Sequence, residues 1–350
     1  MPKKKILVAP LNWGLGHAAR CIPIIYSLLE NNFLPVLASN GEALRLLQHE
    51  FPTLKIYRLP SYKVRYSKRG YFLKLKLLSK SVQLQKAIRK EFALTQKIIE
   101  KENIQGIISD NRLGVHSKDV PSVYLTHQLQ VLSGATTYFS TKLHQFYIKK
   151  FDECWVPDFA QEPNLSGKLS HLKKKFPIPI KYIGMLSRLQ KQTESNKYAI
   201  LVLLSGPEPQ REYLEKRLFK ILKDYPKPVL FVKGVMEKKA TKEQHKNLTI
   251  YNFLTGQDLA KAIAQSELII ARSGYSTIMD LAQTTKKAFF IPTPGQFEQQ
   301  YLAARLKQQK IANFCQQDTF DLEKLETLEN YKGFPDLEHN QDLGRFFGFL

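Results

Sequence analysis

Short runs of Val, Ile and Leu alternate along this chain with longer segments of helical periodicity, and the alternation begins a second time near the middle. The apolar runs of the first half are 6–11, 34–38, 55–59, 106–109 and 122–125, and those of the second half are 199–204, 229–232, 268–271 and 288–291. Such alternation is typical of parallel strands joined by crossover helices. We therefore expect an α/β protein made of two Rossmann-like, doubly wound domains.

The boundary between the two domains is expected near residue 190. Residues 176–196 contain two prolines, Gly184 and a polar run, which is the composition of a linker. A length of 350 residues also fits two domains at roughly 150 residues each. We assign 1–188 to an N-terminal domain, 189–325 to a C-terminal domain and 326–350 to a tail whose apolar end is expected to pack back onto the domains.

The chain is strongly basic, with 53 Lys and Arg against 31 Asp and Glu and a net charge of +22. The natural partners of such a protein are anions: phosphates, nucleic acid or an anionic membrane surface. Residues 62–90 hold ten basic residues and no acid, with Tyr, Phe and Leu between them. This basic lobe is interpreted either as a contact with anionic lipid or an anionic acceptor, or as a solvated helix face.

The compartment is predicted to be the cytoplasm. The three cysteines are far apart and form no C-x-x-C pair, so we read them as reduced thiols. No apolar run approaches the ~20 residues that a spanning helix needs. Any membrane contact is therefore expected to be peripheral, on the inner face.

A glycine-rich turn with a histidine follows the first expected strand. Gly14, Gly16 and His17 stand where the strand ends and a helix begins. The spacing departs from G-x-G-x-x-G and no acid follows the second strand, so a nicotinamide cofactor is not expected, nor any other cofactor. A helix N-terminus disfavours imidazolium, which suits His17 to act as a general base, although packing or capping is the alternative role.

A second group of polar residues follows the strand 268–270 and opens a helix. Backbone N–H groups at a helix start, together with nearby hydroxyls, form a ready site for a diphosphate, and an acid further along can bind ribose. A Ser or Thr N-cap without ligand is the alternative. The candidate residues are Arg272, Ser273, Gly274, Ser276, Thr277 and Asp280.

Two further loops belong to the expected donor side. Gln299 and Gln300 stand at a helix start after a Pro/Gly turn, where amides suit the hydroxyls of a sugar. Gly206 follows the first strand of the second domain, and ligands bind beyond the carboxyl ends of parallel strands.

The order of these elements resembles the GT-B glycosyltransferases, in particular the MurG-like family 28 group, over most of the chain. The most specific part is Arg272-Ser273-Gly274 through Asp280, followed by Gln299-Gln300. The resemblance implies two domains facing each other across a cleft, with a nucleotide-sugar donor on the C-terminal one. It also implies that Phe253 and Leu254 frame a uracil, so that the donor is a UDP-sugar.

On the acceptor side, Thr126-His127-Gln128 is similar to the family's HEQN segment without its Glu and Asn. Together with the turn after the strand 106–109, this segment gives four acceptor-side candidates: Asp110, Arg112, His127 and Gln128.

The expected enzyme is a hexosyltransferase in which His17 takes the proton of an acceptor hydroxyl and UDP leaves by inverting displacement. No D-x-D occurs, so the departure of UDP is expected to need no metal. The motif from Gly14 to Cys21 also resembles the PseG-type UDP-sugar hydrolases, in which water attacks instead. A third interpretation, a nucleic-acid-binding protein, has only the basic lobe in its favour.

Overall fold

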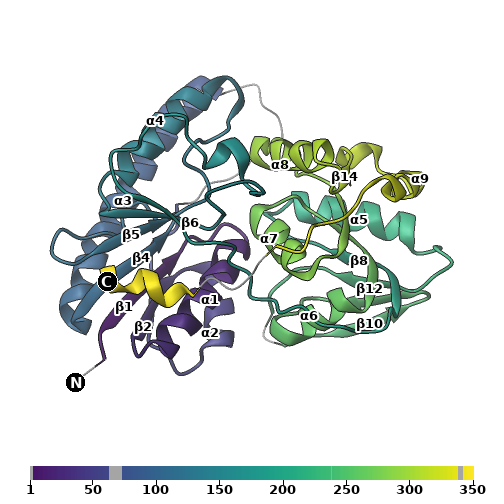
Figure 1. Cartoon of the computed structure of the whole chain (residues 1–350), viewed down its shortest axis with the longest axis horizontal. Helices are drawn as coiled ribbons and strands as arrows, with labels where there is room; N and C mark the ends of the chain where they lie inside the picture. The colour runs from purple at the N-terminus through teal and green to yellow at the C-terminus, as the bar shows by residue number, and fades with distance from the viewer. Residues whose placement is uncertain (1–2, 63–72, 238, 338–341) are drawn as a thin grey trace.

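Two parallel sheets, each covered by helices, make up the molecule, and the two domains lie side by side (Figure 1). The structure is a computed structural model that describes residues 3–62, 73–237, 239–337 and 342–350, and the side chains of 73–82 are not described. Each sheet contains seven strands among these residues. The two-domain α/β architecture expected from the sequence is confirmed.

The N-terminal sheet has the strand order β3-β2-β1-β4-β5-β6-β7, and all of its pairs are parallel. Its central pair joins β1 to β4, with Val8 opposite Ile108. The strands are β1 (Lys5–Pro10), β2 (Leu34–Ser39), β3 (Ile56–Arg58), β4 (Ile104–Asp110), β5 (Ser122–Leu125), β6 (Glu153–Val156) and β7 (Ile180–Tyr182).

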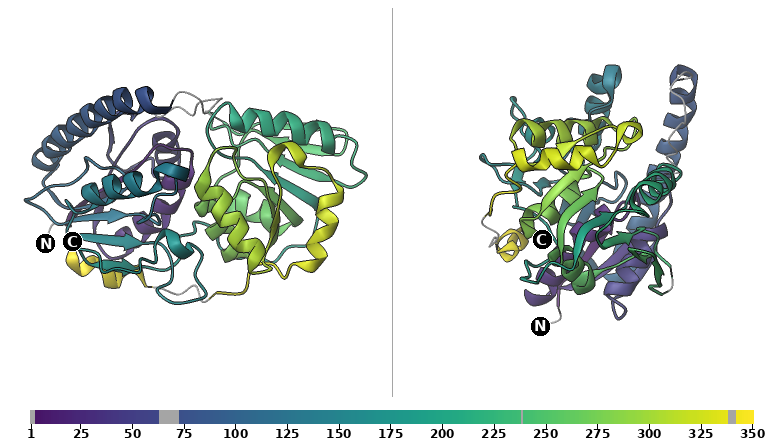
Figure 2. Two further views of the ribbon diagram at one scale, coloured as in Figure 1. Left: turned by 90° about the horizontal axis from the view of Figure 1, so that it is seen from above. Right: turned by 90° about the vertical axis from the view of Figure 1, so that its right-hand side faces the viewer.

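Helices cover both faces of this sheet, and the longest, α3, runs along one side of the domain (Figure 2). Apolar residues of α1, among them Ile22 and Ile25, are fully or almost fully buried, which fixes the helix against the sheet. The helices of this half are α1 (Gly16–Glu30), α2 (Gly41–Glu50), α3 (Leu73–Glu102), α4 (Thr137–Ile148) and the short 3-10 helices η1 (Gly134–Thr136) and η2 (Gly167–Leu169).

The C-terminal sheet has the order β10-β11-β9-β8-β12-β13-β14 and is parallel except for the edge pair β10–β11. Its strands are β8 (Tyr198–Leu203), β9 (Val229–Val232), β10 (Lys242–His245), β11 (Leu248–Tyr251), β12 (Ser266–Ala271), β13 (Lys287–Phe290) and β14 (Asn313–Phe314). Its helices are α5 (Gln210–Leu222), α6 (Gly256–Ala264), α7 (Tyr275–Thr284), α8 (Phe297–Gln308), α9 (Glu323–Glu326), η3 (Gln317–Thr319) and η4 (Thr327–Asn330).

The chain returns to the N-terminal domain at its end. The 3-10 helix η5 (Leu343–Phe349) lies against α1, and Phe347 is buried beside Phe33 and Trp155. Lys4 Nζ donates to the backbone oxygen of Leu350 at 3.2 Å. The tail therefore packs on the first domain after the chain has completed the second.

Every strand expected from the sequence is present, with ends displaced by two residues at most. The segment 176–196, expected to be a linker, begins with β7, whose Ile180 pairs with Cys154 of β6. The extended stretch without regular structure therefore starts after Tyr182. One hydrophobic cluster includes residues of both domains, because α1 and α7 pack against each other across the boundary.

Candidate active site

Two glycine turns, one from each domain, meet where β1 and β8 end. Gly14 and Gly206 have positive φ angles of 73° and 105°, which favour glycine at both positions. A Cβ atom built on Gly14 would lie 4.0 Å from the Cα of Gly206. The two glycine turns therefore approach each other closely at the boundary between the domains.

His17 lies in the first turn of α1 and is held by an aspartate from β4. Its Nδ1 lies 2.9 Å from Oδ1 of Asp110, whose side chain is fully buried, while the His17 side chain is 15% exposed. Asp110 was expected on the acceptor side, and the structure instead places it behind the histidine. Nδ1 of His17 also lies 2.9 Å from Nη2 of Arg20, whereas Nε2 forms no hydrogen bond with the residues that the structure describes.

Arg20, one turn further along α1, completes the support of this pair. Its Nε donates to Oδ2 of Asp110 at 2.7 Å, and its Nη2 donates to Oδ1. Burial alone would raise the pKa of Asp110, but the charges of Arg20 and His17 outweigh it and hold that pKa well below its usual range. Asp110 is therefore a carboxylate wherever the fold persists.

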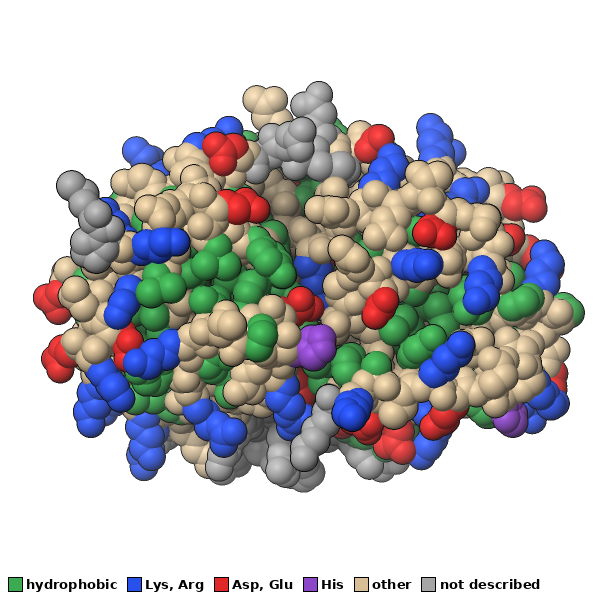
Figure 3. Space-filling model, turned by 90° about the horizontal axis from the view of Figure 1, so that it is seen from below, with side chains coloured by type: hydrophobic (Ala, Val, Ile, Leu, Met, Phe, Trp, Pro, Cys, Tyr) green, Lys and Arg blue, Asp and Glu red, His purple; other side chains and the backbone are tan. Residues whose placement is uncertain are grey.

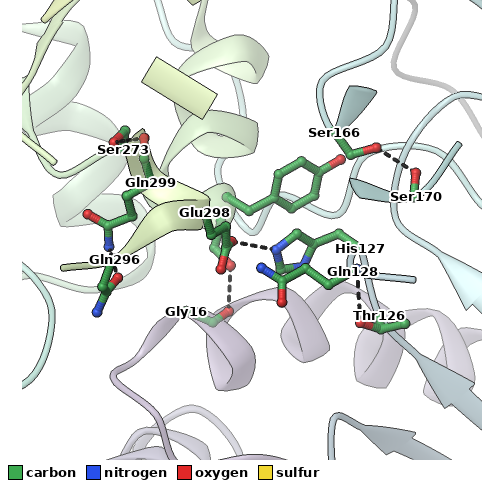
Figure 4. Close-up of polar contacts among 12 residues, drawn as sticks. Gly16, Thr126, His127, Gln128, Ser166, Ser170, Ser273, Gln296, Glu298 and Gln299 are labelled. Atoms are coloured by element: carbon green, nitrogen blue, oxygen red, sulfur yellow. Dashed lines mark hydrogen bonds and ion pairs between the residues drawn. The ribbon is translucent and has the colours of Figure 1, made fainter. Parts of the chain in front are cut away.

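His127 follows β5 and connects this cluster to the C-terminal domain (Figure 4). Its Nδ1 lies 2.9 Å from Nη1 of Arg20, and its Nε2 lies 2.6 Å from Oε1 of Glu298 at the start of α8. The imidazole also stacks on Tyr275 of α7, with the ring centres 4.2 Å apart and the planes 1° from parallel. His127 is 6% exposed, so the structure makes it part of the domain contact.

The expected diphosphate residues divide into two groups. Arg272 is 1% exposed and donates to the backbone oxygens of Ile291, Pro292 and Gln210, and Ser273 is fully buried and donates to the backbone oxygen of Gln299 at 2.8 Å. Both side chains hold the loops together in this structure, and their expected contact with the diphosphate stays a prediction. The start of α7 itself faces the N-terminal domain.

Ser276 of α7, like Tyr275 before it, contacts the N-terminal domain. Its Oγ donates to the backbone oxygen of Gly16 at 3.0 Å, and a Cβ atom on Gly16 would come within 2.9 Å of that Oγ. Gly274, in an extended conformation, is the N-cap of α7, and Thr277 is half-buried in its first turn. The turn of His17 and the N-terminus of α7 are therefore direct neighbours.

Asp280 lies in the second turn of α7 and accepts a hydrogen bond from Oγ of Ser187 at 2.6 Å. Burial raises its pKa to about 6, against the opposing charge of Arg188 and the bond from Ser187. It is near the point where the chain crosses between the domains. A carboxyl at this place is compatible with the expected ribose contact, and the contact stays a prediction.

The amides expected to bind the sugar hold a turn. Gln299 is 8% exposed; its Oε1 accepts from the backbone nitrogen of Thr293 at 2.8 Å and its Nε2 donates to Gln296 at 2.6 Å. Gln300 is half-buried. Thr293 is 1% exposed, yet its Oγ1 has no hydrogen-bond partner in the structure. A Cβ atom built on Gly206 would lie 3.9 Å from this Oγ1. A buried hydroxyl without a partner beside a glycine turn marks a place for a ligand atom.

The residues expected to frame the uracil, and the remaining residue expected on the acceptor side, make contacts within the protein itself. Phe253 is 4% exposed and its ring lies edge-on to His49 of α2 at 6.5 Å, and Leu254 packs against the same core. Arg112 is fully buried, pairs with Glu91 and donates to the backbone oxygen of Pro10 at 3.0 Å. Arg112 therefore braces the sheet and is unable to meet an acceptor.

Four residues of this site were missed as site residues in the sequence: Arg20, Tyr275, Thr293 and Glu298. Arg20 follows His17 by three positions, a spacing that places both side chains on one helix face. Glu298 belongs to the run around Gln299, but its partner His127 is 171 residues away in the sequence. Gln128 is half-buried beside His127.

Residues 63–72 of the basic lobe 62–90 lie outside the described residues, and the side chains from 73 to 82 are not described either. Among the residues that the structure covers, no three His, Cys, Asp or Glu side chains gather in a way that would hold a metal ion. In the same part of the chain, no helix combines the length and apolar character needed to cross a membrane.

Comparison with known proteins identifies the second half. The sequence model of the glycosyltransferase family 28 C-terminal domain matches residues 212–330. The C-terminal domain is a family 28 glycosyltransferase domain. The matched range contains α7, α8 and the loop of Thr293, which are the elements that line the cleft from this side. No curated protein sequence matches the chain.

Solved structures show the same fold over almost the whole chain. MurG from Acinetobacter baumannii is 18% identical with a TM-score of 0.54, and CalG4, the calicheamicin glycosyltransferase, is 12% identical with a TM-score of 0.61; each match covers 94% of this chain and 90% of the other. UGT2 from Phytolacca americana, complexed with UDP-2fluoro-glucose and pterostilbene, is 13% identical with a TM-score of 0.57. That match covers 90% of this chain and 85% of the other. At these identities the likeness shows the GT-B fold.

The family 28 match over residues 212–330 and the GT-B fold both support the assignment to the glycosyltransferases. The enzyme class expected from the sequence, a hexosyltransferase, is confirmed, as are the GT-B fold and the family 28 resemblance.

Proposed function

We propose that the glycosyltransferase moves a sugar from a UDP-sugar to an acceptor hydroxyl by inverting displacement, with His17 as the base. The observation that carries this proposal is the pair of His17 and Asp110 at the cleft, next to the N-terminus of α7. Asp110 fixes Nδ1 of His17, and Nε2 is left for a substrate proton. The arrangement supplies an oriented base on one side of the cleft and free helix N–H groups on the other.

The proposed step balances within the two substrates. The acceptor oxygen forms a bond to the anomeric carbon while its proton goes to Nε2 of His17. The bond from the anomeric carbon to the diphosphate oxygen breaks, and UDP departs with the electron pair. The N–H groups at the start of α7 face the developing negative charge, so the leaving diphosphate is stabilised by the helix dipole and by backbone donors. No metal ion or cofactor is needed in this scheme.

A PseG-like hydrolase remains the alternative, because water can take the place of the acceptor hydroxyl in the same geometry. The two reactions share the base, the donor and the leaving group and differ in the nucleophile. Release of free sugar from a UDP-sugar without an acceptor, at a rate that added alcohols do not reduce, would favour hydrolysis.

The proposal also includes a cytoplasmic location, peripheral contact of residues 62–90 with an anionic membrane, and a lipid-linked acceptor. Its support among the described residues is α4, which exposes Tyr138, Phe139, Leu143 and Phe146 by 49% to 74% beside lysines. Aromatic and basic side chains on one helix face suit a lipid headgroup region.

The charge distribution disfavours the nucleic-acid alternative. On the face drawn in Figure 3, Lys and Arg side chains are scattered over both domains among acids and apolar groups. A nucleic-acid footprint would gather them into a continuous stripe.

Calorimetric titration with UDP, beside GDP and TDP, at physiological salt and with EDTA present, tests the donor assignment. Selective micromolar binding of UDP is the expected result, and UDP-sugars are then screened for transfer and hydrolysis. Absence of nucleotide binding would overturn the donor site, and oligonucleotide binding that weakens steeply with salt would move the function to the basic surface.

A further inference from the structure

The base His17 is the end of a chain of polar contacts that begins in the other domain. Oε1 of Glu298 lies 2.6 Å from Nε2 of His127, and Nδ1 of His127 lies 2.9 Å from Nη1 of Arg20. Arg20 binds both carboxylate oxygens of Asp110, and Asp110 holds His17. Glu298 is therefore connected to the base through His127 and Arg20, since Nη2 of Arg20 also lies 2.9 Å from Nδ1 of His17, and both connecting side chains are nearly or fully buried.

The direction of each hydrogen bond in this chain follows from Arg20. A guanidinium carries donors only, so Nδ1 of His127 must accept from it. The proton of a neutral His127 then resides on Nε2, which donates to Glu298. Burial lowers the pKa of His127, and the nearby charges of Arg20 and His17 act in the same direction against the pull of Glu298. Neutral His127 with its proton on Nε2 satisfies both neighbours at once.

The contacts that hold His127 in this state come from the C-terminal domain. Besides Glu298 of α8, Tyr275 of α7 stacks on the imidazole and donates its hydroxyl to the backbone oxygen of Pro157 at 2.8 Å. Ser276 donates to the backbone oxygen of Gly16, next to the base. All three residues belong to the C-terminal domain, so these contacts exist only while that domain lies against the N-terminal one.

We infer that Glu298 is a positioning residue for catalysis, which orients the pair of Asp110 and His17 through His127 and Arg20 only while the two domains are closed. The inference rests on the proposed role of His17. Without Glu298, the buried Nε2–H of His127 has no acceptor, so the imidazole can turn away from Arg20 and its proton can then exchange between Nδ1 and Nε2. Arg20 then loses an acceptor and its hold on Asp110 changes, so the base is no longer fixed. This arrangement confines an oriented base to the closed state.

Histidine NMR on the full-length chain tests the inference without any substrate. Ring shifts of 13C,15N-labelled histidine report the tautomer of His127 and the titration midpoint of His17, with the resonances assigned from His127→Gln and His17→Gln. The variants are Glu298→Ala, which removes the acceptor, and Glu298→Gln, whose amide oxygen still accepts from Nε2. The charged and titratable groups around His17 and His127, which also influence these spectra, are Asp110, Arg20, Cys21 and Glu298.

A matched control is Glu162→Gln. Glu162 pairs with Arg305 across the same domain boundary at 2.8 Å but contacts no member of the chain that leads to His17. Thermal unfolding of each variant shows whether it is folded before its spectra are compared.

We expect His127 to carry its proton on Nε2 in the wild type, in Glu298→Gln and in the control. In Glu298→Ala the tautomer signal becomes an average and the midpoint of His17 moves by about half a pH unit or more. Equal shifts in Glu298→Ala and Glu298→Gln would assign the effect to charge alone and overturn the inference, as would an unchanged His127 tautomer. Failure of the donor assignment would appear separately, as absence of UDP binding.

Discussion

At the scale of single residues, the site is built from side chains whose neighbours determine their chemistry. His17 is an ordinary histidine in a glycine turn until Asp110 occupies its Nδ1 and Arg20 holds that carboxylate in place. Arg272 shows the opposite case. Its charge was expected at the diphosphate, but four acceptors around its guanidinium hold it inside the domain.

Replacing the base tests its role most directly. His17→Ala is expected to lower turnover about 10²- to 10⁴-fold, the usual contribution of general base catalysis, and to leave UDP affinity within about twofold. The fold is expected to be unaffected, because Arg20 and Asp110 keep each other as partners. Steady-state turnover with calorimetric UDP binding measures both quantities. Retained turnover would reject His17 as the base.

Asp110→Asn is the companion variant. It is expected to lose as much turnover as His17→Ala, and the double variant no more than either, because the two residues act as a unit. It also leaves Arg20 buried without a charge partner, at a cost to unfolding of about 3–5 kcal/mol. An additive loss in the double variant would show that the two side chains act independently.

The unpartnered hydroxyl of Thr293 gives a second residue-scale prediction. Thr293→Val is expected to keep or raise the melting temperature, since the hydroxyl has no hydrogen bond in the free protein. If the donor supplies the missing partner, UDP-sugar affinity falls about five- to tenfold, equivalent to about 1–1.5 kcal/mol. Thr319→Val, on an exposed turn away from the cleft, is the control. Unchanged affinity would place the donor elsewhere.

Asp280 yields a pH-dependent prediction. Burial raises its pKa in the folded protein to about 6, above the usual 3.8 of an aspartate, so the folded state binds the proton more tightly than the unfolded state. The carboxyl therefore destabilises the fold progressively as the pH rises from about 4 to about 6, and fully above that. Asp280→Asn keeps an acceptor for Ser187 and is expected to raise the melting temperature at pH 7.5 but not at pH 3.5. A gain of equal size at both values would contradict the raised pKa.

At the scale of elements, the sequence predicts what is local and misses what is exposed or distant. Most of the buried strands were found because continuous Val, Ile and Leu runs are distinctive, but β6 and β11 were missed although they are buried, because their short sequences include polar residues. The edge strand β10 was missed because all four of its residues, Lys242–His245, are polar and exposed, and β7 because it lies in a segment with the composition of a linker.

The same division holds for the site. Both glycine turns and the start of α7 could be read from strand-loop-helix patterns, since each is contained in about ten residues. The hydrogen bond between His127 and Glu298 joins the two domains, and no local sequence pattern predicts it. Burial of Ser273 and Arg272 also depends on tertiary packing, which the local sequence does not contain.

The exposed face of α4 carries the element-scale prediction. Along this helix Lys142 lies over the ring of Tyr138 and Lys150 over that of Phe146, so the basic and aromatic groups share one surface at the top of the N-terminal domain (Figure 1). Phe139→Ser with Phe146→Ser is expected to weaken co-sedimentation with vesicles of phosphatidylcholine and phosphatidylglycerol at least about tenfold, because each ring contributes about 1.5–3 kcal/mol when buried.

Neutral phosphatidylcholine vesicles and Tyr213→Ser, an exposed aromatic of the other domain, are the controls for that experiment. Binding to anionic vesicles that the α4 variant leaves unchanged would locate the membrane contact in another part of the protein. Self-association that disappears with the two Phe residues would instead make α4 an interface between copies.

At the scale of the whole molecule, two connections join the domains: the chain crossing after β7 and the tail that returns from the C-terminal domain. The tail ends in η5, whose Phe347 is 2% exposed and lies 5.8 Å from Phe33 and 6.2 Å from Trp155 between ring centres. Because α1 carries His17 and also packs against η5, the tail supports the helix that positions the base.

Phe347→Ala therefore has an expected effect on the N-terminal domain although the residue belongs to the end of the chain. Loss of a buried aromatic ring costs about 3–5 kcal/mol, which appears as a lower urea midpoint. Trp155 fluorescence follows the transition in a Trp13→Phe background, since these are the two tryptophans of the chain. Gly348→Ala in the same 3-10 helix is the control, because a Cβ there meets no atom within 4 Å. Equal midpoints for the two variants would mean that the tail rests on the domain without stabilising it.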